Sequence, residues 1–254
     1  MTTAPHPARW SQSVLDTIGD VAFELLPAGA TVLDPFSGVG IERLAKALGD
    51  GYDLAVGVEL EAEWLPEGGD MVQANSLRLP FRDRSFGALV SSCAYGSRLA
   101  DSHDAKDSCK RCDGAGATLA ARVGTEPTLA PCKACGGSGL SKRNTYKHTL
   151  GRDPSPDSST TMQWGPAYRD LHERVWRECA RVLAPGALVL LNVSNHIRAG
   201  KEKHVAEWHL NAWLMLGARV HHARRIPTPR LGFGQNGDAR VDGELLLVLN
   251  TPPA

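Results

Sequence analysis

The stretch Thr31-Val32-Leu33-Asp34-Pro35-Phe36-Ser37-Gly38-Val39-Gly40 decides the fold of this chain. A short apolar run ends in an acid, a turn of small residues follows, and apolar residues then recur at helical spacing from Ile41 to Leu48. A strand, a tight glycine turn and a helix bring backbone N–H groups close to a ligand at the carboxyl end of a parallel strand. The glycine spacing differs from both G-x-G-x-x-G and the P-loop. The stretch therefore predicts a ligand-binding strand–turn–helix unit of another kind.

The size and charge of the chain limit its class. Its 254 residues suffice for one large α/β domain with an insertion, and 28 basic residues balance 28 acidic ones. Residues 1–9 are polar and do not resemble a signal peptide, and no run approaches the roughly 20 apolar residues of a membrane span. We expect a soluble, cytoplasmic protein with no membrane partner. The oligomeric state stays open.

Outside residues 97–160, helical and extended patterns alternate along the chain. This alternation predicts a mostly parallel sheet with helices on both faces, and its last two strands should pair antiparallel. The predicted helices are 11–25, 41–48, 166–183 and 205–216. The predicted strands are 31–34, 53–59, 70–76, 87–92, 187–194, 220–226 and 245–249.

A second acid follows the glycine turn at a typical distance. Glu59 ends a buried strand 19 residues beyond Gly40, about where a Rossmann-type fold places a carboxylate that binds ribose hydroxyls. The glycine turn and this acid together resemble the D-P-F-x-G-x-G region of DNA amino-methyltransferases, the DNA methylase N-4/N-6 family. The resemblance implies S-adenosylmethionine as cofactor and a Rossmann-like class I methyltransferase fold with a seven-stranded sheet. The implied cofactor-binding residues are Asp34, Pro35, Phe36, Ser37, Gly38, Gly40, Glu59 and Asn75.

Asn75 is the implied contact to the adenine of the cofactor, because the following Leu79-Pro80-Phe81 resembles the segment that closes over it in many class I methyltransferases. A turn-forming Asn is the alternative.

The fourth predicted strand leads into Ser92-Cys93-Ala94-Tyr95, where the family carries Ser/Asp/Asn-Pro-Pro-Tyr. The resemblance implies that these four residues are catalytic. The Ser92 oxygen and the Cys93 carbonyl would accept hydrogen bonds from an exocyclic amine, and the Tyr95 ring would stack on an extruded base. Cys93 and Ala94 replace two prolines, which lowers the stiffness of the loop.

The insertion at residues 97–160 contains two copies of C-x-x-C-x-G-x-G, similar to the zinc repeats of DnaJ-type chaperones. The two pairs supply four thiolates for a structural, tetrahedral Zn²⁺. The predicted metal ligands are Cys109, Cys112, Cys132 and Cys135. We expect residues 1–96 and 161–254 to form the methyltransferase domain around this zinc-binding module.

The insertion is also basic. Between Arg98 and Arg152 it carries ten Lys/Arg and five acidic residues, and residues 142–148 place Tyr146 among cations. That arrangement suits phosphate contact and base stacking, so we expect the module to face DNA, with RNA not excluded. A solvated charged loop is the alternative. Trp164 and Tyr168 are further candidates for base stacking or for the core.

These features predict a methyltransferase that modifies an exocyclic amine in DNA, on N4 of cytosine or N6 of adenine. Two alternatives remain. One is a C5-pyrimidine methyltransferase with Cys93 as nucleophile, although the glutamate such enzymes use is absent from Leu191-Asn192-Val193. The other is a catalytically degenerate methyltransferase fold that binds nucleic acid through its zinc module.

Overall fold

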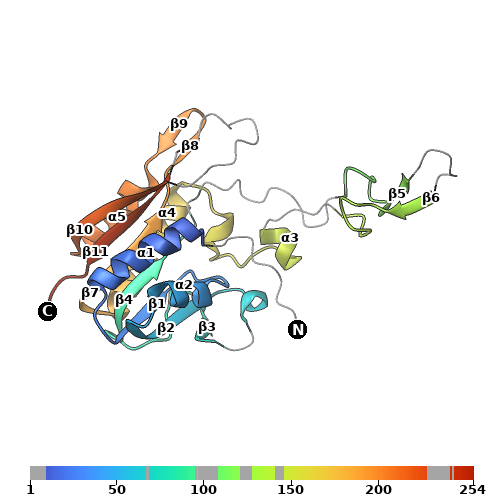
Figure 1. The fold of residues 1–254 in the computed structure, drawn as a ribbon. Helices are drawn as coiled ribbons and strands as arrows, with labels where there is room; N and C mark the ends of the chain where they lie inside the picture. The colour runs from blue at the N-terminus through green and yellow to red at the C-terminus, as the bar shows by residue number, and fades with distance from the viewer. Residues whose placement is uncertain are drawn as a thin grey trace.

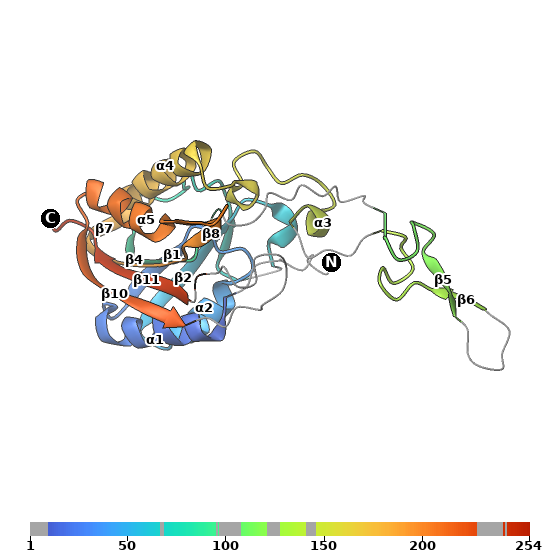
Figure 2. The same cartoon turned by 90° about the horizontal axis from the view of Figure 1, so that it is seen from above.

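The computed structural model describes residues 10–66, 69–94, 96, 108–120, 128–140, 146–227, 241 and 243–254. Most of these residues form one body in which helices cover a central sheet (Figure 1). A small hairpin element between β4 and α4 stands away from this body in both views (Figure 1, Figure 2).

The central sheet has seven strands in the order β10-β11-β7-β4-β1-β2-β3. Strand β11 pairs antiparallel with both of its neighbours, and the other pairings are parallel. This order, with one reversed strand beside the edge, is the class I methyltransferase fold and confirms the predicted fold class. The strands are β1 (Ala30–Asp34), β2 (Tyr52–Glu59), β3 (Met71–Gln73), β4 (Phe86–Ser91), β7 (Leu183–Val193), β10 (Arg219–Pro227) and β11 (Gly243–Asn250).

The helices lie on both faces of the sheet (Figure 2). Helices α1 (Gln12–Leu25) and α2 (Ile41–Leu48) pack on one face, and α4 (Pro166–Val182) and α5 (Val205–Met215) pack on the other. Within the part of the chain that the structure describes, none of the helices has the length and apolar character needed to cross a bilayer.

Consecutive strand residues alternate between the two faces. Val32 and Leu190 pack with α1 and α2, whereas Leu33 and Leu191 pack with α4 and α5. Because both faces are covered, both sets are apolar, which explains the continuous apolar runs in the sequence.

The parallel strands end at one edge of the sheet, and β1 and β4 mark the point where the strand order reverses. Ligands bind in the crevice at such a switch point in open α/β sheets. The predicted cofactor loop follows β1 and the predicted catalytic loop follows β4, so the topology places both at this crevice.

Two short hairpins lie outside the helix–strand alternation. Strands β5 (Ala117–Ala120) and β6 (Thr128–Pro131) form an antiparallel hairpin, and α3 (Tyr146–Leu150) follows it. After β7, β8 (His196–Arg198) and β9 (Lys201–Lys203) form a second hairpin. The 3₁₀ turns η1 (Ala62–Trp64) and η2 (Ser159–Thr161) complete the described elements. Sequence periodicity did not predict these hairpins, because their strands have only three or four residues.

Candidate active site and metal centre

A cavity of about 1030 Å³ lies at the carboxyl edge of the sheet. Its walls come from the loops after β1, β2, β3 and β4, from the end of β7 and from the start of β11. Seven of the predicted site residues line it together: Pro35, Phe36, Ser37, Gly38, Gly40, Glu59 and Asn75. From the predicted catalytic loop, Ser92, Cys93 and Ala94 line the same cavity. Tyr95 lies outside the described residues.

Two positions of the first loop need glycine, Gly38 because of its backbone conformation and Gly40 because of close packing. Gly38 has a φ of 54°, in the left-handed region that favours glycine. A Cβ atom on Gly40 would lie 2.7 Å from the Trp10 ring, and Gly40 is the N-cap residue of α2. The backbone can therefore turn tightly from β1 into the helix along the cavity wall.

Asp34 lies directly behind this loop and is fully buried. Its Oδ1 accepts hydrogen bonds from Phe36 N at 3.1 Å and from Ser91 Oγ at 2.7 Å, which fix the turn and join β1 to β4. Its Oδ2 has no hydrogen-bond partner among the described residues. Burial raises the pKa of Asp34 to about 7, although the two hydrogen bonds oppose this shift.

Glu59 ends β2 on the cavity wall. Its Oε1 accepts a hydrogen bond from Glu61 N at 2.8 Å. Burial raises the pKa of Glu59 to about 7, and the nearby charges of Glu61 and Asp34 add to the shift. A buried carboxyl group with a raised pKa is suited to a ligand that brings its own hydrogen-bond donors.

Residues 152–157 are attached by hydrogen bonds to the segment that follows β2, next to Glu59. Arg152 binds the carboxylates of Glu61 and Glu63 through contacts of 2.7 and 2.8 Å. The backbone N–H of Ser155 donates to Glu61 Oε1 at 2.7 Å. No local pattern in the sequence predicts these contacts, because they join residues about 90 positions apart.

Asn75 forms the turn that was the alternative considered for it. Its Oδ1 accepts a hydrogen bond from Leu77 N at 2.9 Å, as in an Asx turn, and its Nδ2 donates to Asp157 at 2.7 Å. Because Asn75 also lines the cavity, its contact with the adenine of a cofactor stays a prediction.

The aromatic candidates for base stacking are mostly buried. Tyr146 is only 4% exposed and packs edge-on against Trp64, with ring centroids 5.7 Å apart. Tyr168 is fully buried within α4. The expectation that Tyr146 belongs to an exposed basic surface is therefore corrected. The side chains of Lys142, Arg143 and Lys147 lie outside the described residues.

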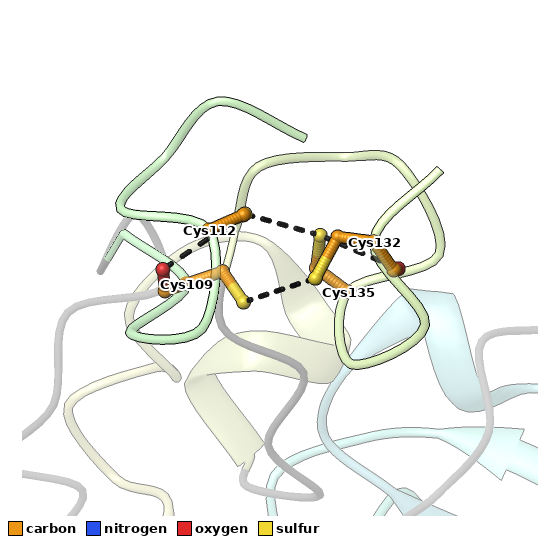
Figure 3. Close-up of side chains that lie close together, drawn as sticks. All are labelled: Cys109, Cys112, Cys132 and Cys135. Carbon is orange, nitrogen blue, oxygen red and sulfur yellow. Dashed lines mark hydrogen bonds between the residues drawn. The ribbon is translucent and has the colours of Figure 1, made fainter. Parts of the chain in front are cut away.

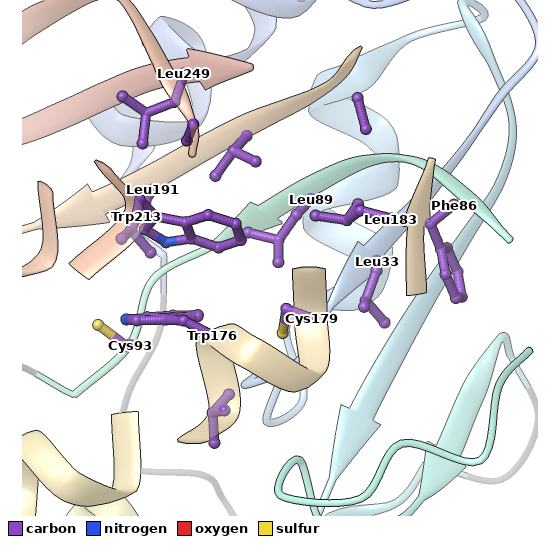
Figure 4. Close-up of a cluster of buried hydrophobic side chains, with 14 of the residues drawn as sticks. Leu33, Phe86, Leu89, Cys93, Trp176, Cys179, Leu183, Leu191, Trp213 and Leu249 are labelled. Carbon is purple, nitrogen blue, oxygen red and sulfur yellow. The ribbon is translucent and has the colours of Figure 1, made fainter. Parts of the chain in front are cut away.

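The thiol of Cys93 points into the core and lies beside Trp176 (Figure 4). Its side chain is 2% exposed, with Sγ 3.6 Å from His209 Nε2. Burial raises the pKa of Cys93 to about 12. A buried thiol with so high a pKa is a poor nucleophile, which argues against the C5-methyltransferase alternative.

A chain of buried hydrogen bonds supports the predicted catalytic loop from the side of the core. Trp176 Nε1 donates to His209 Nδ1 at 3.0 Å, and because indole can only donate, the proton of neutral His209 is on Nε2. His209 Nε2 then donates to the Tyr168 hydroxyl at 2.9 Å, which donates to the Ala94 carbonyl at 2.6 Å. Burial lowers the pKa of His209 well below its usual value, so the ring stays neutral.

Two further cavity residues, Asn192 and Glu244, are not among the predicted site residues. Asn192, near the end of β7, donates through Nδ2 to Ser92 Oγ at 3.2 Å and to Glu244 Oε2 at 2.7 Å. Glu244 stands at the start of β11 and is 9% exposed. Only the reversal of β11 brings its first residues to the edge where β4 and β7 end.

The four predicted metal ligands meet in the hairpin element (Figure 3). The thiols of Cys109, Cys112, Cys132 and Cys135 are all buried, and their sulfur atoms lie within 4.8 Å of one another. The Cys112–Cys135 and Cys109–Cys132 sulfur distances are 3.8 and 4.0 Å. Four sulfurs at about 2.3 Å from one zinc ion would be about 3.8 Å apart, so the cluster fits a tetrahedral metal.

The cysteines of this cluster differ in the pKa of their thiols. Burial opposes ionisation of Cys135, but hydrogen bonds from the backbone of Gly139 and Gly137 and from neighbouring thiols lower its pKa to about 6. Burial raises the pKa of Cys112 to about 11. A bound cation would favour the thiolate form at every position.

The glycines of the repeat interlock the two halves of the cluster. Cys109 N donates to Gly139 O, and Cys132 N donates to Gly116 O, both at 2.8 Å. A Cβ on Gly116 would lie 2.4 Å from Gly137 O, and one on Gly139 would lie 2.3 Å from Gly114 O. The repeated glycines are thus needed for the two halves to approach each other.

No protein-family model and no curated protein matches the sequence. Among solved structures, the chain is similar to the (4+2)-cyclase SpnF, with 13% identity over 97% of this chain and 84% of that chain and a TM-score of 0.50. A SAM-dependent methyltransferase from Methanosarcina mazei has 12% identity over 92% of this chain and 98% of its own, with a TM-score of 0.48. One from Aquifex aeolicus has 11% identity, coverages of 95% and 94%, and a TM-score of 0.46. Identities this low concern the fold and leave the reaction open.

Proposed function

We propose that this chain is an S-adenosylmethionine-dependent methyltransferase that acts on an exocyclic amine in DNA, N4 of cytosine or N6 of adenine. The observation that carries the proposal is the single cavity that joins the glycine loop after β1 to Ser92 after β4. A cofactor and a substrate held at these two loops would meet within one cavity.

The cofactor would occupy the half of the cavity beneath the glycine loop. When bound, it supplies an activated methyl group. The Gly38–Gly40 backbone would approach its amino-acid end, and the buried Glu59 carboxylate would accept hydrogen bonds from its ribose hydroxyls. Asn75 would contact its adenine. The raised pKa of Glu59 supports this assignment, because two added donors would stabilise the ionised carboxylate.

The substrate would occupy the half of the cavity at the catalytic loop. Ser92 Oγ and the Cys93 carbonyl would orient the amine, and Tyr95 would stack on the base. The hydrogen bond from Tyr168 to the Ala94 carbonyl restrains a loop that lacks the two prolines of the family pattern. The chain thus has a means of pre-organisation that the sequence pattern did not indicate.

We further propose that residues 97–160 form an inserted module with a structural Zn²⁺ bound by the four cysteines. Tyr146 and residues 157–160 of this segment line the cavity. DNA contact by this module rests on its basic composition alone.

Calorimetric titration with S-adenosylmethionine, followed by mass spectrometry of nucleosides from treated DNA and RNA, tests the proposal. We expect binding of the cofactor and the appearance of N4-methylcytosine or N6-methyladenine. Cofactor binding without any methylated base would favour the degenerate fold. C5-methylcytosine that disappears in Cys93→Ala would favour the C5 reaction instead.

A further inference from the structure

The β8–β9 hairpin is a short, charged element that follows β7 directly and extends beyond the central sheet (Figure 1). Asn192, near the end of β7, lines the cavity, and β8 begins four residues later at His196. Asn195 anchors the hairpin, because its Nδ2 donates to Glu202 and its Oδ1 accepts from the N–H of Ala206 in the first turn of α5, both at 2.9 Å. The hairpin is therefore held at the edge of the sheet where the cavity lies.

One face of the hairpin carries all of its basic side chains. The pairs that lie directly opposite each other include His196 with Lys203 and Arg198 with Lys201. Directly opposite residues share a face, and so do residues two apart along a strand, so these four side chains point to the same side. The pKa of His196 agrees with this arrangement: burial lowers it, and the charges of Arg198 and Lys203 lower it further.

The acidic residue of the hairpin lies away from this basic face. Glu202 belongs to the remaining cross-strand pair, which points to the other side, and its Oε1 accepts the hydrogen bond from Asn195. Arg198 and Lys201 are exposed, and Lys203 is half-buried. Among the residues that the structure describes, no acidic side chain forms an ion pair with any of these three cations. Their charge is therefore available to an anionic partner.

Folding alone does not favour the residues at the tip of the hairpin. Arg198 and Lys201 are like charges directly opposite each other, an arrangement that destabilises a strand pair. The turn between them consists of Ala199 and Gly200, with φ values of 51° and 70°. Such turns favour Asn-Gly, and an alanine in the left-handed region is strained. Strained positions cluster where proteins hold ligands, and an anion bound at this tip would offset the repulsion between the two cations.

We propose that the basic face of the β8–β9 hairpin binds the phosphodiester backbone of the DNA substrate beside the cavity. The inference rests on the proposed function and adds the element that holds the strand whose base enters the cavity. Charge complementarity selects this partner, because two successive rows of basic side chains suit the repeating negative charge of a nucleic-acid backbone. Contacts of this kind position a strand without reading its sequence.

The salt dependence of DNA binding tests this inference without any turnover. Fluorescence anisotropy would measure the affinity of the full-length, zinc-loaded protein for a short, labelled single strand of DNA at several salt concentrations. Each phosphate contact contributes about 0.7 to the slope of log affinity against log salt concentration. The double variant Arg198→Gln/Lys201→Gln should therefore reduce the slope by about 1.4 and weaken binding by about tenfold.

Two control variants separate the basic face from the total charge. Arg174→Gln/Arg177→Gln removes the same charge from exposed positions on α4 and should keep the wild-type slope. Glu202→Gln changes a charge on the opposite face of the hairpin, keeps an acceptor for Asn195 and should also keep the slope. Thermal unfolding and an unchanged affinity for S-adenosylmethionine would verify that each variant is folded.

Three results would overturn the inference. One is a folded Arg198→Gln/Lys201→Gln protein that keeps the wild-type slope; if mass spectrometry still finds methylated exocyclic amines, the proposed function stands and only the role of the hairpin fails. The second is an equal loss of slope in Arg174→Gln/Arg177→Gln, which would assign the effect to total charge. The third is a wild-type protein that does not bind DNA, in which case the proposed function fails as well. The expected loss of slope without any methylated base would support the hairpin contact and contradict the methylation.

Discussion

At the scale of single residues, burial decides which groups can act. Cys93 occupies a predicted catalytic position, yet its thiol packs in the core and burial raises its pKa to about 12. Glu59 is also buried, but it lies on the cavity wall where a ligand can reach its carboxylate. Burial raises the pKa of both groups. It makes the Cys93 thiol unreactive, whereas the Glu59 carboxyl group can still accept hydrogen bonds from a ligand in the cavity.

We expect Glu59→Gln to weaken binding of S-adenosylmethionine by about 10- to 100-fold at pH 8, because a charged hydrogen bond contributes about 1.5–3 kcal/mol. Burial raises the pKa of Glu59 to about 7, so the carboxylate that accepts both hydroxyls forms only above that pH. Wild-type affinity should accordingly rise as the pH passes through about 7.

Calorimetry across a pH series measures this effect, with Glu173→Gln on the exposed side of α4 as control. The variant should show a weaker pH dependence, with Asp34 contributing what remains. Equal pH profiles for wild type and Glu59→Gln would contradict the assignment.

Tyr168→Phe should slow methyl transfer by about tenfold without changing cofactor affinity. It removes the donor to the Ala94 carbonyl and leaves the buried N–H of His209 without its acceptor, at a cost of about 1–3 kcal/mol in stability. Single-turnover kinetics and chemical denaturation measure the two effects. Tyr52→Phe, at the start of β2, is the matched control. A wild-type rate in Tyr168→Phe would show that the loop does not need this restraint.

At the scale of elements, glycine contacts assemble the cysteine hairpin element. Gly116 and Gly137 both have positive φ, but only Gly116 faces a backbone oxygen at 2.4 Å from the position of a Cβ. For Gly137 the nearest atom, Pro131 Cβ, lies at 3.7 Å. A side chain at either position would be strained by the positive φ, but only Gly116 lacks the space for a Cβ atom.

Gly116→Ala should therefore weaken zinc binding much more than Gly137→Ala, because it forces the two halves of the cluster apart. Competition with a chromophoric chelator gives the zinc affinity of each variant. We expect Gly137→Ala to show only the strain of a left-handed alanine, about 1–2 kcal/mol. Similar losses in both variants would mean that strain, and not the contact between the halves, sets the affinity.

At the scale of the whole molecule, the cysteine cluster and the sheet are separate sources of stability. The four cysteines form their own cluster, distinct from the two cores that pack on the faces of the sheet. In both views the hairpin element stands away from the sheet (Figure 1, Figure 2). Contacts from Arg152, Ser155 and Asp157 attach the returning chain to the cavity wall.

Removal of zinc with a chelator should consequently unfold the cysteine element and leave the main thermal transition nearly unchanged. A segment without its own apolar core depends on the metal, whereas the sheet does not. Calorimetry would follow the main transition, and hydrogen exchange would report on residues 108–140. Collapse of the main transition on chelation would show that the two parts fold together. Restoration by added Zn²⁺ is the control.

The sequence by itself determined the fold class, the loop after β1 and the cluster of four cysteines. Each of these features depends on residues that are close together in the sequence. The periodicity of apolar residues indicates the strands and helices, a short run of small residues indicates the turn, and the spacing of the cysteines indicates their pairing. Residues 31–40 and the four cysteines could therefore be predicted without any knowledge of contacts between distant segments.

Only the tertiary structure decided the surroundings of the predicted catalytic loop. It buried Cys93 and Tyr146, tied Arg152 to Glu61, and brought Glu244 beside Ser92. These contacts join residues far apart in sequence, and no local periodicity encodes which side chains will meet when strands pair. Burial, and with it the pKa of each group, depends on that packing, so the chemistry of Asp34, Glu59 and Cys93 became visible only in the folded chain.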